Sequence, residues 1–536
     1  MTARTSKEDI PSFMAASNGT AVLNPLGVAP QALDNVYIRA RSRPRRHPPR
    51  GASIQYKWTV LTVTTVGVLM AGIDSRIMIV GLPRIAESLR ADAEQAIWLT
   101  QAYVLGSTCA LLLIGRVSDV VGRVKIYTSG FGVFTFGSLL VSLAANAPMA
   151  IAFRFIQGLG SAILFTNSAA MIVDAVPEKE LGFFLGINQV AFRAGAMAGL
   201  TVSGVLLSFF DWRALFYINL PIGIFGTLWA QRRLREIAVI EAGAPIDWRG
   251  FATFVVFISS LLLALTTAAY GFASWETFTI LGAVSAIALM LFVAFELRTP
   301  SPLLDLRLLR IREYSGGLVA QLLNAIAFGA VLLLLSLYFQ LVRGLSPLQT
   351  GLIIIPLDIA SVALGPLSGK LSDRFGHLPF TTGGLAVVSL SLFLFATTDA
   401  FTPMPLVIAY MVVFGAGLGI FASPNMSSIM GSVPPERRGI ASGFRATFFN
   451  VGFVLSLNLA ILAMAFTVPY AFVSKVIASG DAVAFTTAQR ALFQSGLRTA
   501  FLWMALLNSA AIVPSLLRGR RVRNRRPTTA AAVPEA

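Results

Sequence analysis

Ionisable side chains within long apolar stretches are the residues of this chain best placed to do chemistry. Asp74 and Arg154 each lie inside such a stretch. At 1.5 Å per helical residue, Asp74 lies ~13 Å from Pro83 and Arg154 ~8 Å from Met149, which places both in the same half of a membrane. A carboxylate beside a buried arginine can exchange a proton when its surroundings change. Asp74 and Arg154 are therefore proton-coupling candidates, and a purely structural ion pair is the alternative.

Other polar side chains in the apolar stretches are candidates for lining a solute cavity. Gln157 follows Arg154 by three residues and shares its helical face, whereas Arg76 lies about 200° around the helix from Asp74. Arg76 either selects anionic or zwitterionic solutes or binds a carboxylate elsewhere. Asp358 has no cation at helical spacing on its own helix, so we expect a neutral acid that contacts the solute. The remaining candidates, for which helix–helix hydrogen bonds are the alternative role, are Asn188, Gln189, Arg193, Gln321 and Asn324.

The chain lacks the residue sets of several other chemistries. His47, His377 and Cys109 are its only histidines and cysteine, so neither an intrachain disulfide nor a His/Cys metal cluster can form. The segment 365–371 resembles a phosphate-binding loop, but it has three residues between its glycines instead of four and no Ser or Thr after Lys370. We therefore expect no metal site, no cofactor, no nucleic-acid partner and no ATP-driven activity.

Composition places these residues in a membrane protein. Of 536 residues, 56% are apolar and 12% are charged, about half the charged fraction of a soluble protein. A spanning helix needs about 20 apolar residues. The chain has fourteen such stretches, at roughly 57–82, 97–115, 125–146, 149–173, 182–208, 214–230, 250–270, 277–296, 315–341, 349–369, 379–397, 404–430, 440–466 and 497–517. We expect an all-α integral membrane protein, which excludes a soluble enzyme and a strand-built outer-membrane barrel.

Lysine and arginine are distributed unequally across these spans. The net charge is +17, and 31 of the 42 Lys and Arg residues lie on the side of both termini, seven on the opposite side and four inside spans. Positive residues gather in cytoplasmic loops, so both termini are predicted to be cytoplasmic in an inner (plasma) membrane. Residues 1–56 are rich in Arg and Pro without helical periodicity, so we expect a disordered tail and no cleaved signal peptide.

A nine-residue segment occurs twice in the chain. Gly115-Arg-Val-Ser-Asp119-Val-Val-Gly122-Arg123 recurs 254 residues later as Gly369-Lys-Leu-Ser-Asp373-Arg-Phe-Gly376-His377. Both copies follow the second span of a six-span unit, so the chain has two parallel six-helix repeats and two extra central helices. In transporters with parallel repeats, the solute site lies at the interface between them.

Each copy is predicted to be a gating loop. Gly115 and Gly122 permit a tight turn and a close approach of helices. Asp119 can accept hydrogen bonds from helix N-terminal amides or from Arg123, which would lock the second and third spans together. The corresponding residues of the second copy are Gly369, Asp373 and Gly376.

The repeats and charge runs predict five parts of the chain. They are a disordered cytoplasmic tail at 1–56, a six-helix bundle at 57–230, two additional helices with cytoplasmic linkers at 231–314, a second six-helix bundle at 315–517, and a basic cytoplasmic tail at 518–536.

These motifs resemble those of the major facilitator superfamily, in particular its fourteen-span drug:proton antiporter branch. The loop G-x-x-x-D-x-x-G-R is the most characteristic signature of the superfamily. Further matches are Trp98 with Tyr103, Arg154-Phe-Ile-Gln157-Gly158-Leu-Gly160, Asp211-Trp212-Arg213 through Gly223, and Pro434 through Gly443. The resemblance covers about Lys57 to Arg518 and implies two bundles that rock around a central cavity and exchange solute for protons.

Three departures from the family pattern bear on coupling. The first span has Arg76 and Ile79 where the family has Thr and Asn. The span-five motif G-P-x-x-G-G appears at 199–204 without its proline, and an Arg-Gln pair of span thirteen is replaced by Phe449-Asn450. Antiport is the family expectation, and the altered span-five motif weakens it.

The sequence as a whole favours a secondary active transporter. It predicts proton-coupled export of small amphipathic or hydrophobic organic compounds by a monomer in the lipid bilayer. The alternatives are proton-coupled uptake or uniport of a defined organic anion and, less favoured, a non-transporting membrane receptor.

Overall fold

The computed structural model describes most of the chain between its two tails: residues 54–177, 180–237, 245–270, 275–299, 302–433, 438–469, 472 and 486–519. Within these ranges the regular structure is helical, and fourteen helices are long and apolar enough to cross a membrane. The all-α fold with fourteen spans is therefore confirmed. The predicted tails at 1–56 and 518–536 lie almost entirely outside the described residues.

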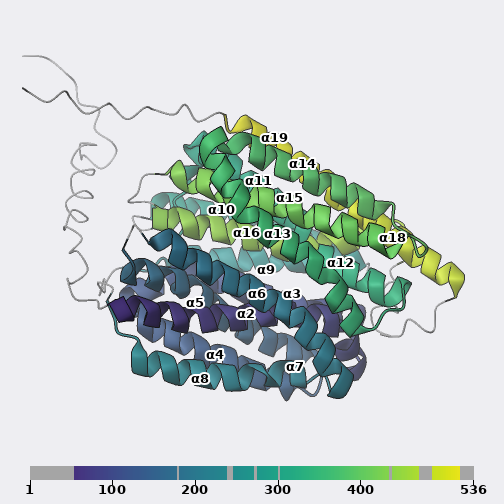
Figure 1. Ribbon diagram of the computed structural model, residues 1–536, viewed down its shortest axis with the longest axis horizontal. Helices are drawn as coiled ribbons and strands as arrows, with labels where there is room; N and C mark the ends of the chain where they lie inside the picture. The colour runs from purple at the N-terminus through teal and green to yellow at the C-terminus, as the bar shows by residue number, and fades with distance from the viewer. Residues whose placement is uncertain are drawn as a thin grey trace, which may run out of the picture. The chain divides into compact units, whose positions relative to one another are not determined.

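The first six spans pack into one bundle, drawn in purple to blue-green in Figure 1. In this bundle α2 packs mainly on α6, α3 on α5, and α4 on α5 and α8. Its helices are α2 (Ile54–Ser88), α3 (Ala93–Val121), α4 (Arg123–Ser142), α5 (Ala147–Ala175), α6 (Leu181–Phe209), the short α7 (Ala214–Tyr217) and α8 (Asn219–Arg233).

The two extra spans lie between the repeats in sequence and at the side of the bundles in space. Helix α9 (Trp248–Tyr270) packs against α3 of the first bundle and α16 of the second. Helix α10 (Trp275–Arg298) packs mainly on α9, and only 17% of its apolar window is buried. The pair is therefore peripheral, and α9 is its link to both bundles.

The last six spans form the second bundle, drawn in green to yellow in Figure 1. Its first span is assembled from α11, α12 and a π-helical turn, η2, and is preceded by a short 3-10 helix, η1. The elements are η1 (Leu306–Arg310), α11 (Arg312–Gly329), α12 (Val331–Leu337), η2 (Tyr338–Val342), α13 (Pro347–Phe375), α14 (His377–Ala396), α15 (Met404–Gly431), α16 (Arg438–Ala465), α18 (Thr487–Ala510) and α19 (Ile512–Leu517).

Helix caps distinguish the two ends of the bundles. At one end, called the Asp92 end here, Asp92, Ser346 and Thr486 each form a capping box with the third residue of the following helix. At the other, the Gly122 end, Gly122 and Gly376 turn the chain with φ of 114° and 87°, conformations that favour glycine. These capping residues and glycines therefore fix where the helices begin and end, close to the ends of the apolar stretches.

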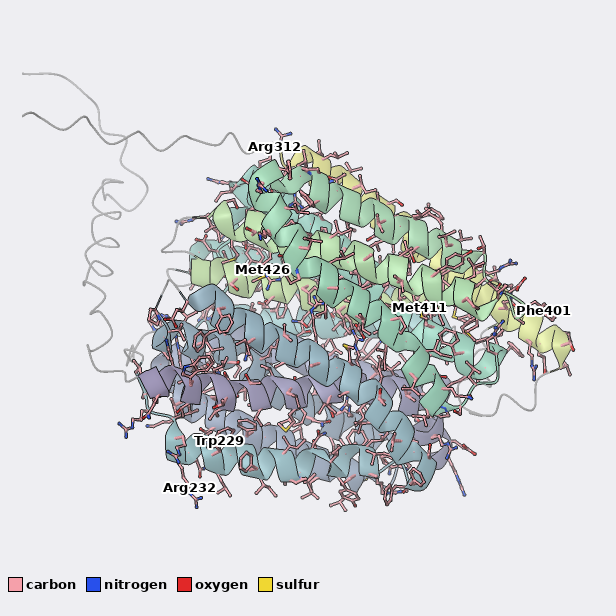
Figure 2. The ribbon with its side chains drawn as sticks, viewed as in Figure 1. Trp229, Arg232, Arg312, Phe401, Met411 and Met426 are labelled. Carbon is pink, nitrogen blue, oxygen red and sulfur yellow. The ribbon has the colours of Figure 1, made fainter. Side chains whose placement is uncertain are left out.

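Charged residues mark the Gly122 end in the same way in both bundles. Figure 2 shows Arg232, at the end of α8, at the lower left of the view and Arg312, at the start of α11, at the top left of centre, whereas Phe401 lies at the far right. Arg518, predicted to belong to the basic tail, is instead buried: its Nη2 donates to Asn425 Oδ1 at 2.7 Å. Burial lowers the pKa of Arg518 to about 10, so it remains charged at neutral pH.

The two bundles contact each other along a seam near the Asp92 end. A Cβ added at Gly204 of α6 would lie 2.6 Å from Leu348 Cα of α13, and one added at Gly351 of α13 would lie 2.6 Å from the Leu200 carbonyl oxygen of α6. Contacts this short leave no room for a side chain, so the two backbones are packed directly on each other.

Candidate coupling and substrate site

The predicted pair of Asp74 and Arg154 is present, and it is sealed inside the first bundle. Arg154 Nη1 of α5 donates to Asp74 Oδ2 of α2 at 2.8 Å, and the two side chains are 1% and 0% exposed. Gln157 Nε2 donates to Asp74 Oδ1 at 2.8 Å, and Arg154 Nη1 also donates to Gln157 Oε1 at 2.6 Å. The carboxylate and guanidinium therefore satisfy each other inside a hydrogen-bonded network, as buried charges require.

Three further residues of this network were not predicted as site residues from the sequence. Asn219 of α8 donates to Asp74 Oδ1 at 3.1 Å, and Ser138 of α4 accepts from Gln157 Nε2 at 2.6 Å. The Tyr103 ring lies 4.3 Å from Arg154 Cζ, close enough for a cation–π contact. Asn219 and Tyr103 occur in the motifs that resemble the superfamily, but their contacts depend on helix rotation, which spacing alone does not give.

A second charged cluster lies on the seam between the bundles. Arg76 Nη1 of α2 forms an ion pair with Asp358 Oδ2 of α13. Arg193 Nη1 of α6 donates to Ser361 Oγ of α13 at 2.8 Å, one turn from Asp358. Arg193 also interacts electrostatically with Asp358 and Arg76. This seam cluster thus joins three helices of both bundles and places one carboxylate among two guanidinium groups.

The expectation of a neutral acid at Asp358 did not take account of a cation from another helix. Its own helix has none at helical spacing, as the sequence indicated, but Arg76 of the other bundle supplies one. Of the two roles left open for Arg76, binding a carboxylate elsewhere is the one found. The side chains of Arg76 and Asp358 are 18% and 9% exposed, so this pair retains access to solvent that the Asp74–Arg154 pair lacks.

Glycines on the Gly122 side of this cluster adjoin open space. Gly186 lies seven residues before Arg193 and Gly365 seven residues after Asp358, about two turns in each case, so each shares a face with a seam residue. A Cβ added at Gly186, Gly365 or Gly115 would have no neighbouring heavy atom within 4 Å. The backbones are therefore in direct contact near the Asp92 end, whereas these glycines nearer the Gly122 end adjoin open space.

At the Asp92 side the seam is held by a polar contact that the sequence did not single out. Gln101 Nε2 of α3 donates to Asn458 Oδ1 of α16 at 2.6 Å, and Asn458 Nδ2 donates to the Leu262 carbonyl of α9 at 3.3 Å. Both side chains are buried. The sequence signal for this contact was the position of the two amides inside apolar spans, because an uncharged amide in a membrane helix also needs a hydrogen-bond partner.

The other cavity candidates have different surroundings. Asn188 accepts from Ser168 Oγ at 3.0 Å, and Asn324 Nδ2 donates to Asn508 Oδ1 at 2.8 Å. Both contacts join helices within one bundle, which is the alternative role considered for these residues. Gln321 is 6% exposed within the second bundle. The side chain of Gln189 lies outside the described residues.

The first predicted gating loop contains a three-residue ion-pair network, called the latch here, formed by Arg123 with Asp119 and Asp174. Arg123 Nη2 donates to Asp119 Oδ1 at 3.0 Å, and Arg123 Nη1 donates to Asp174 Oδ2 of α5 at 2.6 Å. The predicted Asp119–Arg123 contact is therefore present, with Asp174 as an unforeseen third member. Gly122 provides the tight turn, whereas the close helix approach expected at Gly115 is not found because Gly115 adjoins open space.

The second predicted gating loop keeps the turn and changes the charges. Gly376 has φ 87°, and a Cβ added at Gly369 would lie 2.5 Å from Ser423 Oγ of α15. His377 occupies the position of Arg123, so the second copy lacks the guanidinium that forms the latch in the first. The side chain of Asp373 lies outside the described residues.

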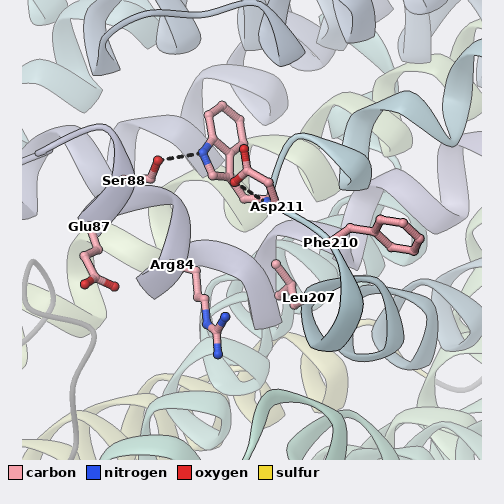
Figure 3. Close-up of a pocket in the computed structure, with 7 residues that line it drawn as sticks. Arg84, Glu87, Ser88, Leu207, Phe210 and Asp211 are labelled. Atoms are coloured by element: carbon pink, nitrogen blue, oxygen red, sulfur yellow. Dashed lines mark hydrogen bonds between the residues drawn. The ribbon is translucent and has the colours of Figure 1, made fainter.

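A small pocket near the Asp92 end lies apart from both charged groups. It has a volume of about 360 Å³ and is lined by residues of α2, α6 and the loop after α6, including Arg84, Glu87 and Asp211. Figure 3 shows Ser88 and Asp211 beside it, and Trp212 Nε1 donates to Ser88 Oγ at 2.9 Å. The Asp211-Trp212-Arg213 motif therefore closes one end of the first bundle rather than contributing to the seam.

Two parallel six-helix repeats with a charged cluster at their seam define a two-bundle membrane transporter. The sequence model of the Major Facilitator Superfamily matches residues 64–457. The chain therefore belongs to the Major Facilitator Superfamily, whose members are transporters rather than enzymes.

Relatives of this chain include transporters with different solutes. It is 31% identical over 402 residues to the riboflavin transporter RibZ of Clostridioides difficile, covering 75% of this chain and 87% of that one. It is 31% identical over 401 residues to the multidrug resistance protein Stp of Mycobacterium tuberculosis, covering 74% of each. The family is thus shown, whereas the solute differs among relatives.

Solved structures agree with the fold. A bacterial homologue of the human lysosomal transporter Spinster, in an inward-facing and unoccupied conformation, superimposes with a TM-score of 0.61 at 15% identity, covering 87% of this chain and 97% of that one. The human organic anion transporter MFSD10 superimposes with a TM-score of 0.58 at 15% identity, covering 86% and 99%. At these identities the likeness concerns the fold alone.

Proposed function

We propose that this protein is a proton-coupled secondary active transporter that exports small amphipathic or hydrophobic organic compounds by alternating access. The observation that carries the proposal is the Asp74–Arg154 pair, a charge pair sealed in the first bundle next to a second charged cluster at the seam. A carboxylate held ionised by an arginine can take up a proton when the two separate. Because both residues belong to the first bundle, that separation would come from a movement of α2 against α5 within the bundle.

The proposed orientation places the Gly122 end and both termini in the cytoplasm of the inner (plasma) membrane. The excess of lysine and arginine on that side supports it. In this orientation the structure is open to the cytoplasm, where an exporter loads its solute. Since one chain forms both bundles and the seam, we propose that it works as a monomer in the lipid bilayer.

The test is transport in proteoliposomes with and without an imposed pH gradient. Asp74→Asn removes the ionisable carboxyl group and keeps the size of the side chain and one of its two acceptor oxygens. We expect it to abolish gradient-driven accumulation of an organic dye while dye binding, measured by fluorescence anisotropy, persists. Asp211→Asn, at an exposed aspartate of the same bundle, is the matched control and should keep full activity. Full gradient-driven accumulation by Asp74→Asn would contradict the proposal.

A second candidate function is uptake or uniport of a defined organic anion. The seam cluster favours it, because Arg76 and Arg193 outnumber Asp358 there. Direction separates the two candidates: dye accumulation in inside-out vesicles energised by an acidic interior indicates exchange for protons. Accumulation only in right-side-out vesicles, with the outside acidic, indicates uptake with protons, and gradient-independent equilibration indicates uniport.

A further inference from the structure

The two charged groups of α2 differ in their charge balance. Asp74 and Arg154 neutralise each other, and both are closed to solvent. In the seam cluster, Asp358 is the one carboxylate and Arg76 and Arg193 are two cations. The seam cluster therefore has one surplus positive charge.

That surplus lies where a solute can reach it. Arg76 and Asp358 are 18% and 9% exposed, and Arg193 is half-buried. The open space beside Gly186 and Gly365 begins two turns away on the same helical faces. A solute entering from the Gly122 end would therefore meet the seam cluster before it meets the closed part of the seam.

The chemistry of the cluster selects the charge of that solute. A guanidinium is permanently charged and presents its N–H groups in a planar fork that matches a carboxylate. A cation in a weakly solvated site is stabilised by an anion and destabilised by a second cation. Arg76 is already paired with Asp358. Arg193 donates a hydrogen bond to Ser361 Oγ at 2.8 Å, which holds it toward the seam. Arg193 is therefore the guanidinium that remains to bind an anion.

We infer that the solutes are organic anions, compounds with a carboxylate or a similar group on an apolar body, and that Arg193 with Arg76 binds the anionic group. The inference rests on the proposed function and names its substrate class. It assigns the two charged groups to separate tasks, proton coupling at Asp74 and recognition of anionic charge at Arg193 with Arg76 beside it.

The experiment uses the full-length protein and two dyes that share a xanthene ring system, fluorescein as the anion and rhodamine 123 as the cation. Binding is measured by fluorescence anisotropy and transport in proteoliposomes. We expect the wild type to bind fluorescein at least about tenfold more tightly than rhodamine 123. Arg193→Gln should reduce that preference about tenfold, and Arg193→Lys should keep most of it.

Two further variants separate charge recognition from structural support. Ser361→Ala removes the hydrogen bond to Arg193 and keeps the charge, so it should retain the preference for fluorescein. Asp358→Asn adds to the surplus of positive charge and should strengthen fluorescein binding. Arg213→Gln, the same substitution at an exposed arginine of the first bundle, is the control and should bind as the wild type does.

The outcomes distinguish this inference from the proposed function. Stronger binding of rhodamine 123, an unchanged preference in Arg193→Gln, or an equal loss in Ser361→Ala would overturn the recognition of anions and leave proton-coupled transport standing. Selective fluorescein binding without gradient-driven transport would support the inference and contradict the proposed function. Failure of the wild type to bind either dye would count against the inference.

Discussion

Asp74 and Arg76 lie two residues apart on α2, yet they belong to two different environments. Asp74 faces its own bundle, where Arg154, Gln157 and Asn219 surround it and solvent is excluded. Arg76 faces the other bundle, where its partner Asp358 lies on α13. Helix α2 thus presents a fully paired charge to its own bundle on one face. On the other face it presents a charge at the seam between the two bundles.

This difference indicates which interactions stabilise the fold and which respond to the conformational cycle. The Asp74 network joins α2, α4, α5 and α8 within one bundle, so rigid-body rocking leaves its partners together. The Arg76–Asp358 pair spans the seam, so opening of the seam at the Asp92 end would break it. We therefore expect substitutions in the two groups to differ both in the property they change and in the size of the effect.

The largest effect is expected from Arg154→Leu. It leaves Asp74 as an unpaired buried carboxylate, a change that typically costs about 3–5 kcal/mol of stability. Thermal unfolding can be followed by alkylation of Cys109, which is the only cysteine of the chain and is 2% exposed. Adding Asp74→Asn to Arg154→Leu should restore much of the loss. Arg213→Leu, at an exposed pair, should cost less than about 1 kcal/mol, and an equal loss there would refute the comparison.

A smaller effect is expected from Asp358→Asn. The Arg76–Asp358 pair is partly solvated, so its loss should cost about 1–2 kcal/mol, between the values for exposed and buried pairs. The affinity for the solute should change while pH-gradient-driven transport survives. Loss of coupling in Asp358→Asn, with coupling retained in Asp74→Asn, would reverse the tasks assigned to the two faces of α2.

The smallest effect on stability is expected from Asp119→Asn at the Gly122 end. Asp119 is 36% exposed, so the loss should stay below about 1 kcal/mol. Turnover should nevertheless fall, because Arg123 loses one of the two carboxylates that hold α3, α4 and α5 together there. Glu180→Gln, in another ion pair at the same end, is the control. Turnover equal to that of the control at matched protein content would argue against a gating role.

Sequence alone was sufficient for the fold and for one of the two charged groups. Hydropathy located all fourteen spans, because each must bury or expose apolar side chains over a fixed thickness. The largest shift of a boundary is at α18, which begins at Thr487 rather than near 497 because Arg490 and Arg498 interrupt the apolar pattern. Counting depth along helices also brought Asp74 and Arg154 together, since both lie within one repeat.

The seam could not be predicted in the same way. Helical spacing gives the direction in which Arg76 points, but its partner Asp358 is 282 residues away on a helix of the other repeat. Which helices face each other depends on the packing of the two bundles. The close helix approach predicted at Gly115 is likewise absent, since a Cβ added there has no heavy atom within 4 Å.

The burial of Arg154 against Asp74 also bears on how the chain enters the bilayer. Synthesis proceeds from the N-terminus, so the span that contains Asp74 precedes the span that contains Arg154. Inserting an arginine at the centre of a spanning helix costs about 2.5–3.5 kcal/mol. An aspartate that is already in the membrane offers the incoming arginine a counter-charge, whereas Asn219 arrives later. The order of the two charges along the chain thus makes the first span a docking partner for the fourth during biogenesis.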